Sequence, residues 1–236
     1  MNHQPNNTFT VIALGGSIVV PGTINVSFLK RLRAFLIERM NAGEKFILVV
    51  GGGKTTRVYQ QAAAQAVDVS DEDMDWLGLH ATRLNGHLVR AVFYDHAYPV
   101  MLDDPAKPIA KDDLERFSLL VGAGSRPGWS TDYVAMLLAN RFKTKKVLIA
   151  TTIPYVLNKD PKYHRNVRPL RDLTWTQYRA MVGDAWTPGM KTPVDPIAAK
   201  FAQEHEMTCS VLRGTNLKNL ERYLDGKPFK GSVIHP

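Results

Sequence analysis

Short apolar runs with the character of buried strands alternate along the chain with longer segments whose apolar residues recur at helical spacing. Residues 8–14 predict a first strand, and the uniformly apolar run 46–50 predicts a second strand that is buried on both faces. The segment between them predicts a helix that is capped by Asn25 or Ser27 and ended by Gly43. This alternation is typical of an α/β fold in which helices cover both faces of a mostly parallel sheet.

The same pattern continues through the rest of the chain, without an internal repeat or a low-complexity linker. Further helices are predicted over residues 54–66, 71–93, 131–141, 175–181, 196–204 and 216–224. Further strands are predicted over residues 98–102, 118–121, 146–150, 208–212 and 232–234. We therefore expect one domain over residues 1–236, built as a three-layer α/β/α sandwich around a mostly parallel sheet.

Three predicted strand-to-helix junctions are rich in glycine. They are residues 15–17 (GGS), residues 51–54 (GGGK) and residues 122–132 (GAGSRPGWSTD). Glycine lets the backbone approach a ligand closely, and a helix N-terminus offers unpaired N–H groups to an anion. Each junction alone fits an ordinary tight turn. Because the carboxyl ends of parallel strands open on one crevice, the three together predict a phosphate-binding site.

Two cations follow the triple glycine. Lys54 and Arg57 fall on the first turn of the predicted helix, three residues apart and so on neighbouring positions. They fit an ordinary solvated helix start or a contact with phosphate, and the preceding glycines favour phosphate. The G-x-x-x-x-G-K-[ST] spacing is absent, so Lys54 is not a P-loop lysine.

Composition excludes several other classes of protein. With 44% hydrophobic and 22% charged residues, the chain has enough apolar material for a sizeable core. Cys209, which lies in a strand-like run, is its only cysteine. A single cysteine excludes a disulfide framework within the chain and a metal site built on several cysteines. No apolar run reaches the roughly 18 residues of a membrane span, and the polar N-terminus lacks the apolar core of a signal peptide. We expect a reducing, cytoplasmic location and no contact with a membrane.

The net charge of +8 suits an anionic ligand. One denser basic run spans residues 159–171, but the interleaving of aromatic and basic residues found in RNA-binding sheets is absent. Phosphorylated small molecules therefore suit the charge better than nucleic acid. His80 and His87 lie two turns apart on the long predicted helix, with no third ligand nearby, and we interpret them as ordinary helix residues.

Further blocks of sequence accompany the glycine junctions in a fixed order. They are residues 77–78 (LG), 81–85 (ATRLN), 97–100 (AYPV), 127–132 (PGWSTD), 160–161 (DP) and 194–200 (VDPIAAK). In this order the blocks resemble the amino acid kinase superfamily and, within it, the UMP kinases, nearest the archaeal type. The resemblance runs from Val11 to Pro236. The Thr-Arg-x-Asn and Pro-Gly-x-Ser-Thr-Asp stretches separate the UMP kinases from the acetylglutamate, aspartate and carbamate kinases.

The resemblance implies transfer of the γ-phosphoryl group of ATP to UMP, which gives UDP and ADP in pyrimidine nucleotide synthesis, with Mg²⁺ accompanying ATP. It implies an acceptor-binding part at about residues 8–140 and a nucleotide-binding part at about residues 141–236. Similar UMP kinases form hexamers built from dimers, so a homo-oligomer is expected, with the helix around Leu84 and Leu88 as its dimer contact.

The resemblance also assigns site residues. Those implied to contact UMP are Gly52, Asp75, Ser125, Arg126, Pro127, Gly128, Trp129, Ser130 and Thr131. Those implied to contact ATP are Gly15, Gly16, Ser17, Gly53, Arg57, Thr151, Leu157 and Asp160. Those implied to serve the transfer itself are Lys54, Arg57, Asp132 and Asp195, and no residue is directly assigned as a metal ligand.

Some of these residues have simpler interpretations. Asp75 would hold the ribose hydroxyls of UMP, or it is a helix-start charge favoured by the helix dipole. Ser130 and Thr131 would offer hydroxyls to the acceptor phosphate, or one of them only caps the following helix.

The chain departs from the family in two places. Where most members have lysine, and archaeal UMP kinases usually aspartate, shortly before the first Gly-Gly, this chain has Ala13. Where the family reads Thr-Asn-Val-Asp-Gly-Val-Tyr, residues 151–157 read TTIPYVL. Pro154 removes a backbone donor and fixes φ, so this loop must be rebuilt. Two alternatives therefore stay open: a degenerate kinase fold that binds nucleotide or anion without turnover, and a related kinase acting on another small phosphate or carboxylate.

Overall fold

The structure is a computed structural model that describes residues 8–159, 164–185 and 192–236. Its strands are β1 (Phe9–Leu14), β2 (Lys45–Val50), β3 (Leu119–Gly122), β4 (Lys146–Thr151), β5 (Val156–Leu157), β6 (Pro169–Leu170), β7 (Asp172–Thr174), β8 (Thr208–Arg213) and β9 (Ser232–His235). Its helices are α1 (Gly16–Val19), α2 (Val26–Asn41), α3 (Gly53–Ala66), α4 (Asp71–Val92), α5 (Lys111–Arg116), α6 (Thr131–Arg141), α7 (Trp175–Val182), α8 (Pro196–Glu204) and α9 (Leu217–Leu224).

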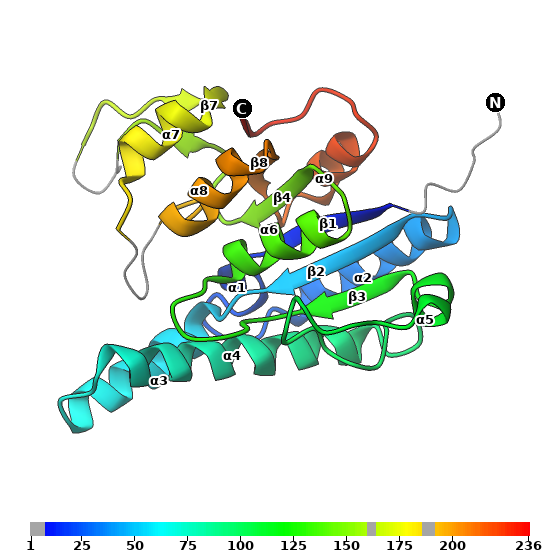
Figure 1. Cartoon of the computed structure of the whole chain (residues 1–236), viewed down its shortest axis with the longest axis horizontal. Coiled ribbons are helices and arrows are strands. Elements are labelled where there is room, and N and C mark those ends of the chain that lie inside the picture. The colour runs from blue at the N-terminus through cyan, green and yellow to red at the C-terminus, as the bar shows by residue number, and fades with distance from the viewer. Residues whose placement is uncertain (1–7, 160–163, 186–191) are drawn as a thin grey trace.

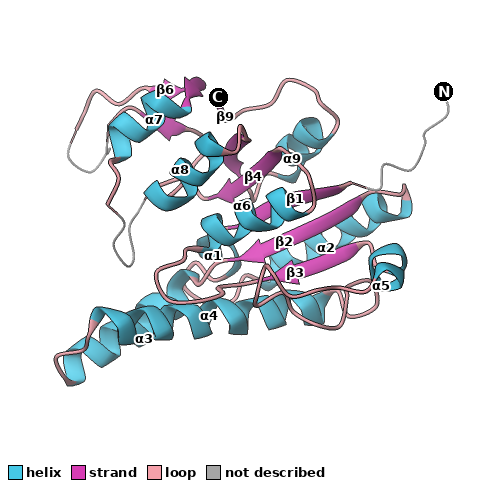
Figure 2. Ribbon diagram, in the orientation of Figure 1, coloured by secondary structure: helices cyan, strands magenta, loops and turns pink. Residues whose placement is uncertain are grey.

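A seven-stranded sheet forms the centre of the molecule, with strand order β3-β2-β1-β4-β8-β9-β7. Figure 2 shows β3, β2, β1 and β4 side by side in this sheet. The neighbouring pairs from β3 to β8 are parallel, β8 and β9 are antiparallel, and β9 and β7 are parallel. The prediction of a mostly parallel α/β sheet is therefore confirmed. The chain runs outward from β1 through β2 to β3 and then returns to place β4 on the other side of β1. The strand order therefore reverses beside β1, and such a reversal opens a crevice at the carboxyl ends of the strands.

Alternate residues of the central strands feed two separate apolar cores. Val11 and Ala13 of β1 face one core, which is closed by α6, α7 and α8. Ile12 and Leu14 of the same strand face the other, which is closed mainly by α2, α4 and α9. Because both faces of β2 are covered, its last five residues are all buried, as its uniformly apolar sequence predicts. The result is the expected arrangement of helices, sheet and helices (Figure 1).

Side-chain caps fix where several helices begin. Asn25 caps α2, Ser70 caps α4, and Ser130 caps α6, each by accepting a hydrogen bond from a backbone N–H of the first turn. Asp195 caps α8, whose first residue is Pro196. The long helix α4 contacts β2, β3 and α3, and Figure 1 shows α3 and the start of α4 extending beyond the sheet.

Residues 98–102 do not form the predicted strand. They touch the edge of β3 only at isolated bridges, between Ala97 and Leu119 and between Leu102 and Gly122. The segment was apolar enough to suggest a strand, but its backbone turns between these two points. The short elements α1, α5, β5, β6 and β7 were not predicted either. No described helix is both long enough and apolar enough to span a membrane.

Candidate active site

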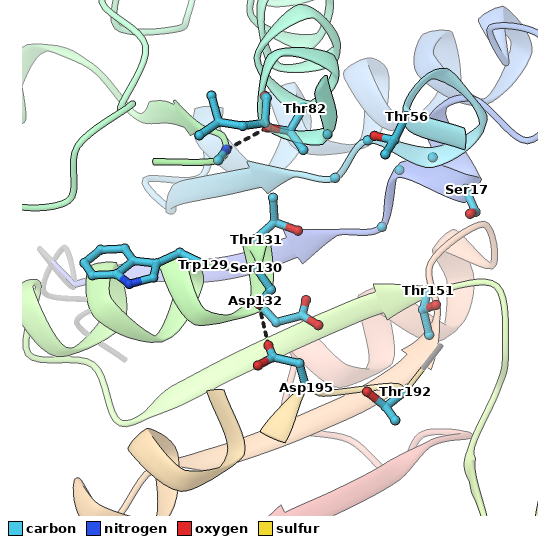
Figure 3. A pocket seen from close by; sticks show the side chains of 18 of the residues that line it. Ser17, Thr56, Thr82, Trp129, Ser130, Thr131, Asp132, Thr151, Thr192 and Asp195 are labelled. Carbon is cyan, nitrogen blue, oxygen red and sulfur yellow. Dashed lines mark hydrogen bonds between the residues drawn. The ribbon is translucent and has the colours of Figure 1, made fainter. Parts of the chain in front are cut away.

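A cleft of about 780 Å³ lies at the carboxyl ends of the central strands, where the three glycine-rich junctions meet (Figure 3). Gly15 follows β1, Gly51 follows β2, and Gly124 follows β3. Helices α3 and α6 begin at these loops, and residues 75–82 of α4 contribute to the wall on the same side. The expectation that these junctions converge is thus confirmed.

The first two glycine junctions pack directly against each other. Gly53 has a φ of +62°, which favours glycine. A Cβ atom built on Gly53 would stand 2.2 Å from the carbonyl oxygen of Gly16, and one built on Gly16 would stand 2.2 Å from the nitrogen of Gly53. These two glycines are therefore required by contact between the loops, whatever ligand the cleft holds.

The third junction forms a loop that is tied to α4. The backbone N–H of Gly128 donates to Oδ2 of Asp75 at 2.8 Å, so Asp75 holds the loop across the cleft. Burial is the main reason why the pKa of Asp75 is raised; the Gly128 N–H opposes this effect, and the negative charge of Asp71 adds to it. The guanidinium of Arg126 lies 4.1 Å from the centre of the Trp129 ring, and this stacked pair stands at the rim of the loop.

Two aspartates share the opposite wall. Asp195 is buried, and its Oδ1 accepts hydrogen bonds from the N–H groups of Ile197 and Ala198. Its Oδ2 accepts a hydrogen bond from the hydroxyl of Ser130, the residue that caps α6 (Figure 3). Asp132 lines the cleft nearby, and burial, followed by the negative charge of Asp195, raises its pKa well above the ordinary value.

The two cations after the triple glycine take different positions. Arg57 lines the cleft, and its Nη1 donates to the hydroxyl of Ser17 at 3.4 Å, which joins the first two junctions. Lys54 is half-buried and does not line the cleft; its backbone N–H donates to the carbonyl of Val20 at 2.9 Å. The side-chain cations that the cleft receives from the described residues are therefore those of Arg57 and Arg126.

Most of the predicted site residues lie together in this cleft. The structure brings together Gly15, Gly16, Ser17, Gly52, Gly53, Arg57, Asp75, Arg126, Pro127, Gly128, Trp129, Ser130, Thr131, Asp132, Thr151 and Asp195. Three others do not line it: Lys54, Ser125 and Leu157. Asp160 lies outside the described residues.

The cleft also holds residues that were not predicted. They are Ile18, Thr56, Gln60, Gly78, Leu79, Thr82, Ile149, Thr152, Ile153, Thr192 and Pro193. Helical spacing could have found some of them: Thr56 and Gln60 share a face of α3 with Gly53, and Gly78, Leu79 and Thr82 follow Asp75 at intervals of three, four and seven. Nothing in the local sequence singles out Thr192 or Pro193.

The two departures from the family pattern are also located. Ala13 is 2% exposed and packs in the core on the α6 side of the sheet, so no charged side chain enters the cleft from that position. The segment after β4 puts Thr152 and Ile153 on the cleft and then turns away into β5, which pairs with β6.

Comparison with known proteins agrees with this geometry. Residues 8–213 match the amino acid kinase family. The chain is 30% identical over 227 residues to the uridylate kinase of Thermococcus kodakarensis, covering 96% of this chain and 99% of that protein. It is also 31% identical over 217 residues to the uridylate kinase of Methanoregula boonei, covering 91% and 90% respectively.

Solved structures give the same result. The crystal structure of uridylate kinase from Archaeoglobus fulgidus aligns with a TM-score of 0.78 at 27% identity, covering 96% of this chain and 99% of that one. The UMP kinase of Bacillus anthracis shares the fold, with a TM-score of 0.74 at 18% identity over 97% of this chain and 96% of that one. The chain therefore belongs to the amino acid kinase family.

Proposed function

We propose that the protein is a UMP kinase, which transfers the γ-phosphoryl group of ATP to UMP and releases UDP and ADP. The observation that carries this proposal is the convergence of three glycine-rich loops on one cleft in a chain whose near-full-length relatives are uridylate kinases. Two nucleotides that carry negative phosphates repel each other, so the protein must hold them in line and offset their charge. Backbone N–H groups and arginines suit both tasks.

The acceptor side of the cleft is the α4 side. Asp75 would hold the ribose hydroxyls of UMP, because a carboxylate accepts two hydrogen bonds from a diol. Gly52 and the loop 125–131 would surround its phosphate, with Arg126 as the side-chain cation at the rim. Ser125, which is outside the cleft wall, would contribute through the loop's backbone only.

The donor side lies beyond the first two junctions. Gly15, Gly16, Ser17 and Gly53 would surround the ATP phosphates, and Thr151 would meet the adenosine end. Arg57 lies where the two sets of phosphates would meet and is the cation best placed to offset charge that develops during transfer. Lys54 could act only by turning its side chain into the cleft, and Leu157 and Asp160 are the least supported of the proposed donor contacts.

Magnesium fits this cleft through its two carboxylates. Mg²⁺ in phosphoryl-transfer sites is usually held by one or two carboxylates together with substrate phosphates. Asp132 and Asp195 would hold the ion together with the nucleotide phosphates. Within the described residues, no cluster of three or more His, Cys, Asp or Glu side chains is placed to hold a metal. When bound, the ion would neutralise charge on the ATP phosphates. Asp195 also accepts the Ser130 hydroxyl, which keeps one carboxylate oxygen on the α6 side of the cleft.

A coupled assay of ADP release tests the proposal directly. The protein is incubated with ATP, Mg²⁺ and, in turn, UMP, CMP, AMP, GMP and dUMP. We expect turnover with UMP and much slower turnover with the purine nucleotides. Nucleotide binding by calorimetry without any ADP release would establish the degenerate-fold alternative. Turnover with carbamate, acetylglutamate or another small phosphate instead of UMP would establish the related-kinase alternative.

We also propose that the protein is a cytoplasmic homo-oligomer, assembled through the exposed side of α4. Leu84 on this helix is 61% exposed, and α3 beside it has no fully buried residue. Tyr59 of α3 and Trp76 of α4 are exposed as well, and exposed apolar side chains on neighbouring helices suit contact with a second copy.

A further inference from the structure

The stretch Thr82–Asn85 of α4 makes contacts that the proposed binding roles do not use. Arg83 and Asn85 do not line the cleft, and yet both donate hydrogen bonds to the loops that do. Asn85 is 3% exposed, and Thr82 is 9% exposed. Polar side chains so deeply buried are costly unless every group has a partner, so their partners indicate what they hold.

Asn85 holds the second glycine junction from behind. Its Nδ2 donates to the carbonyl of Gly51 at 3.0 Å and to the carbonyl of Gly52 at 2.8 Å. Its Oδ1 accepts a hydrogen bond from the hydroxyl of Thr55 at 3.3 Å, on the first turn of α3. Both polar atoms of the amide are thus used on a single loop and on the helix that follows it.

Thr82 and Arg83 hold the third junction in the same manner. The N–H of Gly124 donates to the hydroxyl of Thr82 at 2.8 Å. The guanidinium of Arg83 donates to the carbonyls of Gly124 and Ser125, at 3.1 Å and 3.0 Å. One turn further along, Gly86 lets α4 approach this loop closely, because a Cβ there would stand 2.7 Å from the sulfur of Met101 and 3.3 Å from the Cβ of Ala123.

Because the peptide bond is planar, the hydrogen bonds to these carbonyls also fix the direction of the N–H groups that follow them. The carbonyl of one residue and the N–H of the next point in opposite directions. Carbonyls drawn toward Asn85 and Arg83, which stand outside the cleft, therefore turn the N–H groups of Gly52, Gly53, Ser125 and Arg126 the other way. None of these four N–H groups donates to an acceptor within the described part of the chain. Gly52, Gly53 and Arg126 themselves line the cleft.

We infer that Thr82, Arg83 and Asn85 form a clamp, the α4 clamp, that orients the N–H groups of two separate loops toward phosphate. Arg83 and Asn85 are positioning residues, which hold the loops from outside the cleft. Thr82 also lines the cleft, and its part in the clamp is the hydrogen bond that it accepts from Gly124. The clamp rests on the proposed function, because that function places a nucleotide phosphate at each of the two loops and requires the two phosphates to lie at a fixed distance. Because one rigid helix holds both loops, it also fixes the distance between the two phosphate sites.

Two substitutions test the clamp without removing bulk. Asn85→Asp replaces a donor with a carboxylate oxygen that repels the carbonyls of Gly51 and Gly52. Thr82→Val keeps the shape of the side chain and removes the hydroxyl, whereas Thr82→Ser keeps the hydroxyl. Asn219→Asp is the matched control, since Asn219 is 6% exposed and its amide bonds the carbonyl and the N–H of Lys230, away from the cleft.

We expect Asn85→Asp to lower kcat by about 100-fold, the loss that a small displacement of reacting groups causes. Thr82→Val should raise KM for UMP by about tenfold, as expected for one lost hydrogen bond, and raise KM for ATP less. Thr82→Ser should resemble the unmutated protein in both constants. Asn219→Asp should keep kcat within about twofold, even where urea unfolding shows a comparable loss of stability.

The clamp is overturned if kcat follows stability equally in Asn85→Asp and Asn219→Asp, or if Thr82→Val matches Thr82→Ser. Should Asn85→Asp not fold, Arg83→Lys takes its place, because lysine loses the forked contact that holds the carbonyls of Gly124 and Ser125 from outside the cleft. A second readout separates the clamp from the proposed function. If the unmutated protein makes no UDP, the rise in unfolding temperature caused by UMP or ADP is measured instead. Its loss in Thr82→Val but not in Thr82→Ser supports the clamp, and no rise in the unmutated protein overturns both proposals.

Discussion

Among single residues in the cleft, Asp132 has a carboxyl group whose ionisation is strongly disfavoured by its surroundings. Its pKa is raised well above the ordinary value, first by burial and then by the negative charge of Asp195. A carboxyl whose pKa rises on folding favours the folded state while it is protonated, below its ordinary pKa of about 4. That contribution is lost as the pH rises through the folded-state pKa. At neutral pH the burial of this carboxyl beside Asp195 therefore opposes folding, and a bound cation would relieve that cost.

Asp132→Asn should accordingly raise the unfolding temperature at pH 7 in the absence of nucleotide and metal, while it abolishes phosphoryl transfer. The gain should shrink as the pH is lowered toward about 4, where the unmutated side chain is also neutral. Thermal unfolding followed by circular dichroism from pH 4 to pH 8 checks this. A destabilised variant at pH 7, or a difference that is constant with pH, would contradict it.

Arg57 tests whether charge at the meeting point of the first two loops serves the reaction. Arg57→Ala should lower kcat/KM by about 10²–10³-fold, the loss seen when one preorganised electrostatic contact is removed. The free energy of unfolding should change by no more than about 0.5 kcal/mol, because Arg57 is exposed. Arg31→Ala, which removes another exposed arginine, from α2, is the control and should leave both quantities unchanged. If Arg57→Ala keeps near-normal activity, the triple-glycine loop would have to be interpreted as a structural turn and not as a phosphate-binding loop.

Asp75 tests the acceptor side of the site. An asparagine there can still accept the hydrogen bond from the N–H of Gly128, but it loses the charge and one acceptor oxygen. Asp75→Asn should therefore raise KM for UMP more than KM for ATP and weaken discrimination against dUMP. Steady-state kinetics with UMP and dUMP measure both effects. A folded variant with an unchanged KM for UMP would exclude Asp75 from the ribose site.

At the scale of the elements, two helices begin at a shared joint. Ser130 caps α6 and donates to Asp195, which caps α8. Ser130→Ala should therefore lower the free energy of unfolding by about 2 kcal/mol, since it removes a cap and leaves a buried carboxylate oxygen without its partner. Ser70→Ala removes the exposed cap of α4 and should cost only about 0.5–1 kcal/mol. If urea unfolding shows the same loss of stability for Ser130→Ala and Ser70→Ala, the hydrogen bond between Ser130 and Asp195 adds no stability beyond the helix cap.

Helices with side-chain caps and strands buried on both faces could be predicted from sequence. The ranges 131–141 and 196–204 agree with α6 and α8 at both ends, because Ser130, Asp195 and Pro196 mark those helix starts locally. The two-residue strands β5 and β6 carry too few residues to show any periodicity. The prediction of a strand over residues 98–102 was wrong because the segment meets β3 only at two isolated bridges and leaves Val100 exposed, which tertiary contacts decide and local sequence does not.

At the scale of the whole molecule, the site could be predicted as far as topology alone defines it. Parallel strands bring their carboxyl ends to one edge, so loops distant in sequence were correctly expected to meet. The side of a helix that faces the cleft was harder to predict. Lys54 and Arg57 share the first turn of α3, yet Arg57 reaches the cleft and Lys54 does not line it. The contact between Gly53 and Gly16, which sets the rotation of that helix, is a tertiary feature.

The surfaces of α3 and α4 that face away from the sheet expose several large apolar side chains. Tyr59 of α3 is 57% exposed, and Trp76 and Leu84 of α4 are 40% and 61% exposed. Large apolar side chains that are exposed on two adjacent helices favour association over exposure to water.

Leu84→Glu should therefore lower the molar mass measured by light scattering, because a carboxylate would have to be buried in the contact between copies. Met181→Glu is the matched control: Met181 is 42% exposed on α7, on the opposite side of the sheet from α4, and its substitution should leave the mass unchanged. If both variants keep the mass of the unmutated protein, the contact lies elsewhere. If the unmutated protein is itself a monomer, the exposed side of α4 has no partner copy. Asp75, Thr82 and the loops that α4 holds would then have to keep their positions without support from a second helix, and activity would not depend on protein concentration.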